Sequence, residues 1–260
     1  PESFAKETIV IPLNDRDALE QTLAEHAHDL ACIIVAPVPA NNGLLLQDKS
    51  FLEWLRIKAY KHNVLLIFDE VISGFRVGFE GAAGYYGIQP DIITFGKIIG
   101  GGFPVGAYAA SAEIMSHIAP EGPVYQAGTL SAYPVAMAAG YAALEQCLQE
   151  YFYADMAAKT ARFVAGIQAY CDNKGYEVSI ANIGSIFWVA FTKERIMAAD
   201  QIDPTSMDKF KVLHHELLQR GVYLGPSGYE VGFVSAAHGE ADLEEASAHI
   251  CAAMDVVFAA

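Results

Sequence analysis

The sequence predicts an α/β protein with a mostly parallel sheet flanked by helices, followed by a smaller α+β part. In the first half, short runs that are apolar on both faces alternate with amphipathic helical segments, a pattern typical of buried parallel strands. The second half is mainly helical, with a few short strands. The 260 residues, 53% of them hydrophobic, suffice for a sizeable core. We therefore expect a large domain over residues 1–145 and a small one over 146–260.

The first half alternates between the two kinds of segment. A helix is indicated where Leu19, Leu23 and Ala27 recur on one face. The runs around residues 30–37 and 64–68 are apolar throughout, so we expect strands buried on both faces. The expected elements are a helix over 15–28, a strand over 30–37, a helix over 50–62, and strands over 64–68, 91–95 and 105–110.

The second half contains longer helical patterns and shorter extended runs. Its first segment is rich in alanine and begins at Pro134, a residue favoured in the first turn of a helix. No internal repeat is visible. The expected elements are helices over 134–147, 152–172 and 207–220, a last helix from 240, and strands over 178–180, 186–192, near 222 and over 231–235.

Composition excludes several classes of partner. The net charge is −15, with Lys and Arg scattered along the chain, so an acidic surface would repel nucleic acid. No apolar run reaches membrane-spanning length, and we expect a cytoplasmic protein without a membrane partner. The cysteines lack the paired spacing of zinc sites, which predicts reduced thiols and no metal. They are Cys32, Cys147, Cys171 and Cys251.

Lys97 stands out because residues 87–112 contain only one other charged residue, Asp91. It follows an expected strand and is flanked by apolar residues, so we expect it to be buried. Burial favours the neutral amine, which is a nucleophile. The glycines at 100–102 would let the backbone approach a flat ligand. A surface lysine beside a glycine hinge remains an equally good interpretation of this segment alone.

Asp69 is the second candidate. It follows the apolar run at 65–68, and therefore lies at the carboxyl edge, where α/β sheets bind ligands. A carboxylate there can pair with a protonated ring nitrogen and make the ring an electron sink. Capping a turn and binding magnesium are the alternatives for this residue alone. A strand–helix–strand path could bring Asp69 and Lys97 to one pocket, which favours the cofactor interpretation.

Three long motifs carry a family resemblance. They are FDEVISGFR from residue 68, GYYGIQPDIITFGKIIGGGFPVGAYAAS from residue 84, and GPVYQAGTLSAYPVAMAAG from residue 122. Together they closely resemble the class III aminotransferases, and within that family they look most like the glutamate-1-semialdehyde 2,1-aminomutases. The resemblance covers nearly the whole chain. It implies a fold-type I transferase that binds pyridoxal 5'-phosphate (PLP) and also cycles through the pyridoxamine form.

The resemblance also implies roles for residues of the cofactor site. Lys97 matches the family's Schiff-base lysine, which also moves protons between substrate carbons. Asp69 matches the carboxylate that pairs with the pyridinium nitrogen, and Val71 matches the residue packed on the ring face. Asn41 matches an asparagine that contacts the phenolic oxygen of the cofactor.

Further matches concern the phosphate and the substrate. Gly128 and Thr129 match a phosphate contact that reaches the cofactor of a neighbouring subunit, which implies a homodimer with shared sites. Glu230 matches an acidic residue on the substrate side of the aminomutase branch. The resemblance thus implies conversion of glutamate-1-semialdehyde to 5-aminolevulinate, a step of tetrapyrrole biosynthesis, on a small-molecule substrate.

Two differences from the family pattern qualify this expectation. Ala36 stands where the family usually has a glutamate. The family's N-terminal section, with its phosphate-binding loop, has no match upstream of Pro1, so we expect the C-terminal part of a longer enzyme and an incomplete large domain. The alternatives are another class III aminotransferase, a racemase, or a non-catalytic fragment that lacks the phosphate loop.

Overall fold

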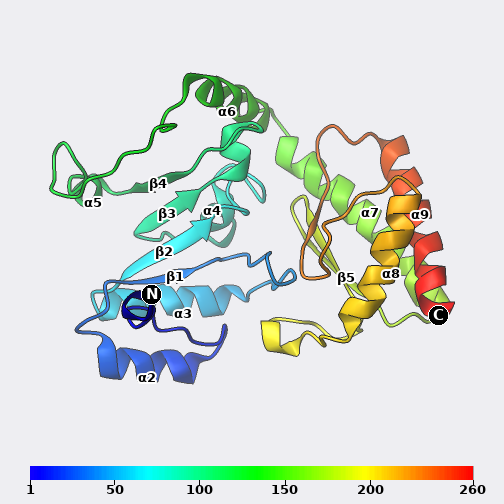
Figure 1. Cartoon of the computed structure of the whole chain (residues 1–260), viewed down its shortest axis with the longest axis horizontal. Helices are drawn as coiled ribbons and strands as arrows, with labels where there is room; N and C mark the ends of the chain where they lie inside the picture. The colour runs from blue at the N-terminus through cyan, green and yellow to red at the C-terminus, as the bar shows by residue number, and fades with distance from the viewer. Residues whose placement is uncertain (260) are drawn as a thin grey trace.

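The computed structural model describes residues 1–259 and contains two separate sheets (Figure 1). The N-terminal sheet has the order β1–β2–β3–β4, and β1, β2 and β3 are parallel while β4 runs antiparallel to β3. This arrangement confirms the expected α/β class with a mostly parallel sheet. The strands are β1 (Cys32–Val35), β2 (Leu65–Glu70), β3 (Ile92–Phe95) and β4 (Ala107–Ala110).

Helices flank this sheet, and two of the longer ones begin at residues that favour a helix start. The side chain of Asp15 accepts a hydrogen bond from the Ala18 amide and so caps α2. Pro134 occupies the first turn of α6, where its missing N–H costs nothing. The helices are α1 (Glu2–Ala5), α2 (Arg16–His26), α3 (Lys49–Lys61), α4 (Gly81–Tyr86), the 3₁₀ helix η1 (Lys97–Gly100), α5 (Ala112–Met115) and α6 (Pro134–Cys147).

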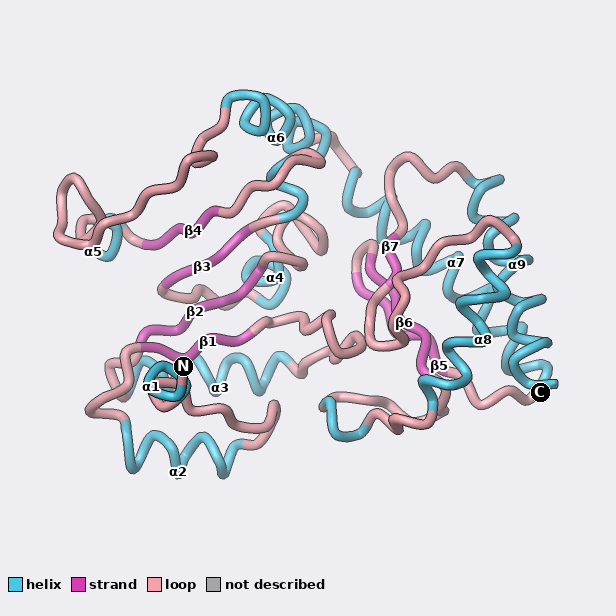
Figure 2. Tube along the Cα trace, in the orientation of Figure 1, coloured by secondary structure: helices cyan, strands magenta, loops and turns pink. Residues whose placement is uncertain are grey.

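The C-terminal sheet is small and antiparallel, with the order β5–β6–β7, and three helices cover it (Figure 2). Every residue of β6 is buried, because the helices pack against this central strand. The elements are α7 (Phe152–Lys174), β5 (Ser179–Ile183), β6 (Ile186–Ala190), η2 (Ala199–Gln201), α8 (Ser206–Gln219), β7 (Gly232–Phe233) and α9 (Glu240–Ala259).

The prediction of a strand near residue 222 is wrong. Gly221 has a φ of +77°, and the amide of Val222 donates to the carbonyl of Leu217 at 2.9 Å. This amide therefore caps the end of α8 and is not available to a sheet ladder. An apolar pattern of three or four residues cannot distinguish these two uses.

The strand around residue 34 is also less buried than expected. The side chains of Ile33 and Val35 pack against the core, whereas Ile34 is 62% exposed. Within the described residues, β1 pairs only with β2, so it forms an edge of the sheet. The apolar run therefore predicted the strand but not the open face on which Ile34 lies.

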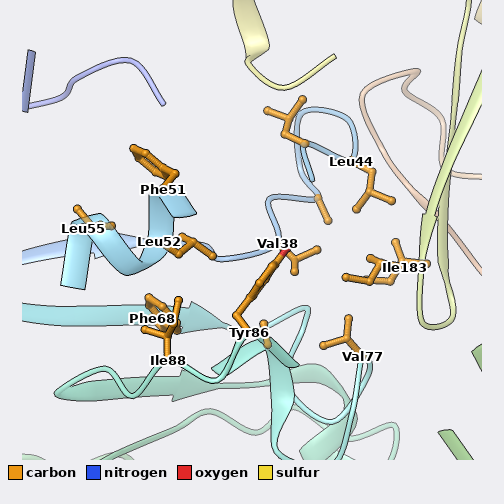
Figure 3. Packing of buried hydrophobic residues seen from close by; sticks show 14 of the residues in the cluster. Val38, Leu44, Phe51, Leu52, Leu55, Phe68, Val77, Tyr86, Ile88 and Ile183 are labelled. Carbon is orange, nitrogen blue, oxygen red and sulfur yellow. The ribbon is translucent and has the colours of Figure 1, made fainter. Parts of the chain in front are cut away.

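One hydrophobic cluster joins the two halves of the chain. Val38, Leu44 and Val77, from loops that follow β1 and β2, lie close to Ile183 of the C-terminal sheet (Figure 3). The same cluster contains Phe68, which has no exposed surface, and burial of such a side chain contributes about 1.5–3 kcal/mol. The parallel sheet thus shares its core with the C-terminal part.

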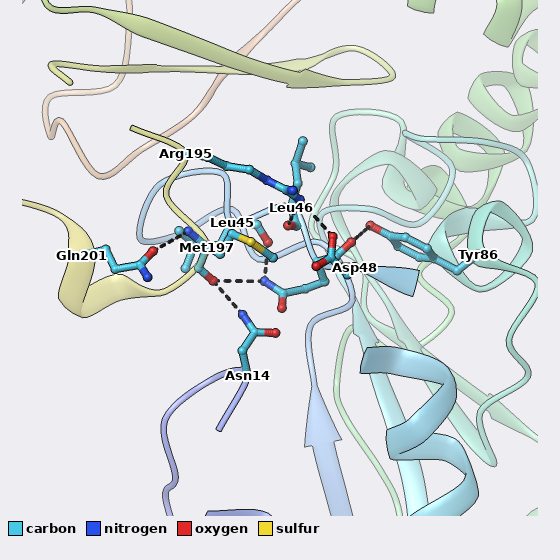
Figure 4. A network of polar contacts seen from close by, with 9 residues as sticks. Asn14, Leu45, Leu46, Asp48, Tyr86, Arg195, Met197 and Gln201 are labelled. Carbon is cyan, nitrogen blue, oxygen red and sulfur yellow. Dashed lines mark hydrogen bonds and ion pairs between the residues drawn. The ribbon is translucent and has the colours of Figure 1, made fainter. Parts of the chain in front are cut away.

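A polar network fixes the same two parts at another point (Figure 4). The amide nitrogens of Asn14 and Gln47 both donate to the carbonyl of Met197, at 3.0 and 3.4 Å. Arg195 donates to a carboxylate oxygen of Asp48 at 3.1 Å, but this pair is exposed and contributes little to stability. The part-buried hydrogen bonds to this carbonyl, more than the exposed ion pair, make the network specific.

Candidate active site

Asp69 and Lys97 lie at the same edge of the parallel sheet. Strands β2 and β3 are neighbours, with Asp69 in register with Thr94, and Lys97 begins η1 two residues after β3 ends. Because the strands are parallel, both residues lie at their carboxyl ends, on the side that faces the C-terminal sheet (Figure 1).

One oxygen of the Asp69 carboxylate is held by its own strand and the next. Oδ1 accepts hydrogen bonds from the amide of Val71 at 3.1 Å and from the hydroxyl of Thr94 at 3.4 Å. Within residues 1–259, Oδ2 accepts no hydrogen bond from another residue. The carboxylate is therefore fixed in direction, with one oxygen available to a ligand.

Val71 provides an apolar surface beside this carboxylate. A Cβ atom placed on Gly96 would lie 3.1 Å from Cγ1 of Val71. The isopropyl group therefore packs against the backbone directly before Lys97. Asp69, Val71 and Lys97 form one group of neighbours, which we call the strand-end cluster.

Lys97 is exposed, and the expectation that it is buried is wrong. The residue has a φ of +47°, in the left-handed region that side chains other than glycine rarely adopt. The left-handed residue comes just after β3, at the carboxyl edge of the sheet, and its side chain is accessible to solvent. Backbone strain of this kind costs roughly 1–3 kcal/mol and concentrates at functional sites.

The glycines after Lys97 serve a different purpose from the one expected. A Cβ atom on Gly101 would lie 2.2 Å from the carbonyl oxygen of Ala139, and one on Gly140 would lie 2.1 Å from that of Ile99. These two glycines let α6 pack backbone to backbone against η1. Only Gly102, with no atom within 4 Å of its Cβ position, leaves open space of the kind a ligand would need.

Asn41 and Glu230 are both exposed, and they come from loops that touch. The amide of Gly43 donates to the carbonyl of Tyr229 at 2.7 Å, and Trp188 Nε1 donates to the carbonyl of Gly228 at 2.8 Å. The segment 225–231, which we call the 225–231 loop, is thereby fixed both to the loop after β1 and to β6.

Gly128 and Thr129 are not part of this arrangement. Both are exposed in the segment that joins α5 to α6, where the carbonyl of Gly128 accepts from the amide of Ser131 at 3.0 Å. In the described chain, no hydrogen bond joins either residue to the strand-end cluster. Their expected role in the site of a neighbouring subunit therefore stays a prediction.

Comparison with known proteins decides the family. Residues 4–242 match the family described as "Aminotransferase class-III". The chain belongs to the class III aminotransferases. The family expected from the motifs is thus confirmed, and the fold-type I assignment with it.

Solved structures of several members of this family resemble the chain. The first is an omega-transaminase from Sphaerobacter thermophilus, with 30% identity over 99% of this chain and 59% of that one, and a TM-score of 0.92. A beta-phenylalanine aminotransferase from Variovorax paradoxus has 27% identity over 96% of this chain and 58% of that one, with a TM-score of 0.87. A glutamate-1-semialdehyde-aminomutase from Pseudomonas aeruginosa PAO1 has 26% identity over 96% and 57%, with a TM-score of 0.84.

These similarities show the family but not the branch. Transaminases and an aminomutase match at comparable levels, so the closest resemblance to the aminomutases is not decided by them. The chain spans somewhat less than 60% of the length of these three proteins. What the whole protein does is therefore a matter for proposal.

The cofactor expected from the sequence is confirmed at the level of the family. One matched structure is a transaminase with PLP bound, and the aminomutase has been solved with the pyridoxamine form, PMP. The strand-end cluster of this class III chain fits such a group, because it offers a carboxylate oxygen without a partner, an apolar side chain and an amine. Lys97 forms no ion pair within the described part of the chain.

Sequence reasoning missed the residue that fixes the start of α4 to the end of β2, next to the aminotransferase site. Glu70, next to Asp69, is fully buried, and its carboxylate accepts from Ser73 Oγ at 2.9 Å and from the amides of Ala82 and Ala83 at 2.6 and 2.8 Å. Burial raises the pKa of Glu70, and these hydrogen bonds oppose the rise. The sequence did carry a signal for this role, because Glu70 is a second carboxylate directly after Asp69 at the end of an apolar strand.

The described residues contain neither a cluster of metal-binding side chains nor a membrane-spanning helix. No group of three or more His, Cys, Asp or Glu side chains in residues 1–259 could hold a metal ion. None of the helices described is both long and apolar enough to cross a membrane.

Proposed function

We propose that this class III aminotransferase chain is part of a PLP-dependent aminomutase that converts glutamate-1-semialdehyde to 5-aminolevulinate. The observation that carries the PLP-dependent chemistry of the proposal is the strand-end cluster, with Asp69 and Lys97 at the ends of adjacent parallel strands. For the aminomutase branch the proposal rests on the motif resemblance at Glu230, which lies in a loop hydrogen-bonded to the loop of Asn41. Similarity to the aminomutase from Pseudomonas aeruginosa PAO1 is consistent with it.

We assign the cofactor contacts to the residues that the motifs indicate. Asp69 would hold the ring nitrogen, Val71 one ring face, and Asn41 the phenolic oxygen. Gly128 and Thr129 would bind the phosphate of a neighbouring subunit. When bound, PLP supplies an aldehyde that bonds to amines and a ring that accepts electron density from the substrate.

The protein's own part in the reaction is proton transfer and charge. The Asp69 carboxylate stabilises a proton on the ring nitrogen, because an opposite charge in contact favours the protonated form. The Lys97 amine takes a proton from one substrate carbon and returns it to the other. Glu230 would orient the amino group of the substrate.

The substrate is tested with the full-length protein and a small panel. We expect glutamate-1-semialdehyde to give 5-aminolevulinate without any added amino donor or acceptor, because the amino group returns to the molecule it left. The comparison is β-phenylalanine with pyruvate, and reactions without protein provide the blank. Transamination of pyruvate with no aminolevulinate would replace the proposal by its second candidate, a transaminase acting on two substrates.

That second candidate rests on a specific observation. The omega-transaminase from Sphaerobacter thermophilus and the beta-phenylalanine aminotransferase from Variovorax paradoxus match this chain with higher TM-scores than the aminomutase does. A racemase would be recognised in the same panel by loss of optical activity without amino transfer. A non-catalytic chain would convert none of the substrates.

We also propose that the protein is a homodimer with shared sites. The segment from residue 103 to residue 141, which includes Gly128 and Thr129, carries many large apolar side chains that are exposed. Such surfaces commonly mark protein interfaces. We expect sedimentation of the PLP-loaded, full-length protein to give twice the monomer mass, and a fully active monomer would exclude shared sites. The side chains are Phe103, Tyr108, Val124, Tyr125, Leu130, Tyr133, Val135, Met137 and Tyr141.

A further inference from the structure

Arg76 is a cation without an acidic partner. It lies in the loop after β2, and its Nη1 donates to Ser185 Oγ at 3.2 Å, while its buried Nε has no hydrogen-bond partner in the described structure. Burial lowers the pKa of its guanidinium, and the groups that oppose this are Cys147 and Tyr153, neither of them a carboxylate. Since an unpaired buried charge is costly, an apolar side chain of similar length would fill this space at lower cost.

The guanidinium also lies over an aromatic ring. Its Cζ lies 4.4 Å from the centroid of the Phe233 ring in β7. A planar guanidinium stacks on such a ring in a way that a lysine ammonium does not reproduce. Phe233 is 39% exposed and also lines a cavity of about 520 Å³ in the C-terminal part. If Arg76 is replaced, the ring therefore has room to move into this cavity.

The backbone around Arg76 is itself fixed. Tyr153 Oη donates to the carbonyl of Phe75 at 3.1 Å. A Cβ atom on Gly184 would lie 3.1 Å from the carbonyl oxygen of Arg76, so the turn between β5 and β6 approaches this loop closely. With the backbone held from two sides, the side chain of Arg76 meets the C-terminal sheet at a defined place.

Arg76 meets the C-terminal sheet at β7, the strand that follows Glu230 in the chain. Phe233 follows Glu230 by three residues, and β7 pairs with β6 through Ile186, next to Ser185. The 225–231 loop has its other anchors at Trp188 and Gly43. Arg76 also follows Asp69 by seven residues in the chain. One side chain thus connects the loop after Asp69 with the strand after Glu230.

We propose that Arg76 is a positioning residue, which sets β7 and the 225–231 loop against the strand-end cluster and thereby tunes how the substrate fits. It acts through Phe233 and does not touch the cofactor. This inference rests on the proposed function, in that the 225–231 loop is taken to face the substrate.

The test uses three variants of the full-length protein. Arg76→Met keeps length without charge, and Arg76→Lys keeps charge without the planar group. Arg162→Met is the matched control, because Arg162 is an exposed arginine on α7 whose nearest carboxylate, Glu240, is 3.7 Å away. Glutamate-1-semialdehyde is the substrate, and β-phenylalanine with pyruvate is assayed in parallel.

We expect the Arg76 variants to lose about 10- to 100-fold in kcat/KM, since small misplacement of a substrate-positioning loop has effects of this size. The loss should fall mainly on KM, and Arg76→Lys should not restore it. Affinity for PLP and the visible absorbance of the bound cofactor should stay unchanged, as should every property of Arg162→Met. Loss of PLP binding together with activity would show a general structural role and overturn the proposal.

A readout independent of activity uses Trp188, whose indole donates to the 225–231 loop. These 260 residues hold one other tryptophan, Trp54 on α3, so Trp54→Phe leaves Trp188 as the only tryptophan of this part, and differences between variant spectra report on it. In this background we expect Arg76→Met to shift the emission spectrum and Arg162→Met to leave it unchanged. Identical spectra for the two variants would overturn the proposal even if the protein had no activity on either substrate.

Phe233→Leu tests whether Arg76 acts through the Phe233 ring. It also keeps the proposal testable if the Arg76 variants do not fold. If Arg76 acts through the ring, Phe233→Leu should raise KM to a similar extent, and the double variant should be no worse than either single one. Additive losses would contradict the route. Failure of wild-type protein to bind PLP or convert any substrate would instead overturn the proposed function, leaving the fluorescence comparison to decide the inference.

Discussion

Lys97→Ala in the full-length protein will abolish the visible absorbance of the lysine-bound cofactor and lower turnover by about 10⁴-fold, the upper end of the range for a lost acid–base group. The side chain is exposed at the edge of the sheet and contacts no acidic group in the described part of the chain. Nothing in the fold depends on its amine. We therefore expect the stability of the variant to match that of the wild type.

The matched control for this prediction is Lys61→Ala. Lys61 is also exposed, in the last turn of α3, and forms no ion pair among residues 1–259. Titration with PLP, followed by absorbance, should give the wild-type spectrum for Lys61→Ala and free cofactor for Lys97→Ala. A retained spectrum in Lys97→Ala would show that another amine holds the cofactor and would remove the central assignment.

Overpacking in Gly140→Ala will cost about 2 kcal/mol, for a net destabilisation of about 1 kcal/mol. The new Cβ would lie 2.1 Å from the carbonyl oxygen of Ile99, so α6 and η1 must separate. This loss exceeds the gain of about 1 kcal/mol that alanine normally brings to a helix interior. Since η1 begins with Lys97, we also expect weaker binding of PLP.

A second helix glycine provides the comparison. Gly166 lies in α7 and is exposed, and the nearest atom to its Cβ position is Ser247 Oγ at 3.9 Å. Gly166→Ala should therefore raise the free energy of unfolding by up to about 1 kcal/mol. Urea unfolding of both variants measures the difference, and a change of the same sign in the two would contradict the backbone contact between α6 and η1.

Much of the fold could be predicted because it depends on local pattern. The helix beginning at Pro134 and the one over α7 were expected within two residues of their observed ends, since apolar spacing and capping residues are near in sequence. The exposure of Ile34 could not be predicted in this way. It depends on which strands lie beside β1, and that is a property of the whole sheet.

The candidate site divides in the same manner. The placement of Asp69 and Lys97 at one edge follows from parallel strands, so the sequence could indicate it. The left-handed backbone of Lys97 and the exposure of its side chain could not be predicted, because no residue type in this segment indicates either one. The contacts of Arg76 and Gly140 could not be predicted, because their partners, Ser185 and Ile99, are distant in sequence.

The shared hydrophobic cluster has a consequence for engineering. Val77 and Val38 of the N-terminal part meet Ile183, Trp188 and Val231 of the C-terminal part in one continuous core. Cutting the chain at a boundary near residue 145 would open that core to water on both sides. A chimera that takes its C-terminal part from another aminotransferase must therefore also take the loops after β1 and β2 from that enzyme. Substrate specificity can then be transferred only together with both sides of this shared core.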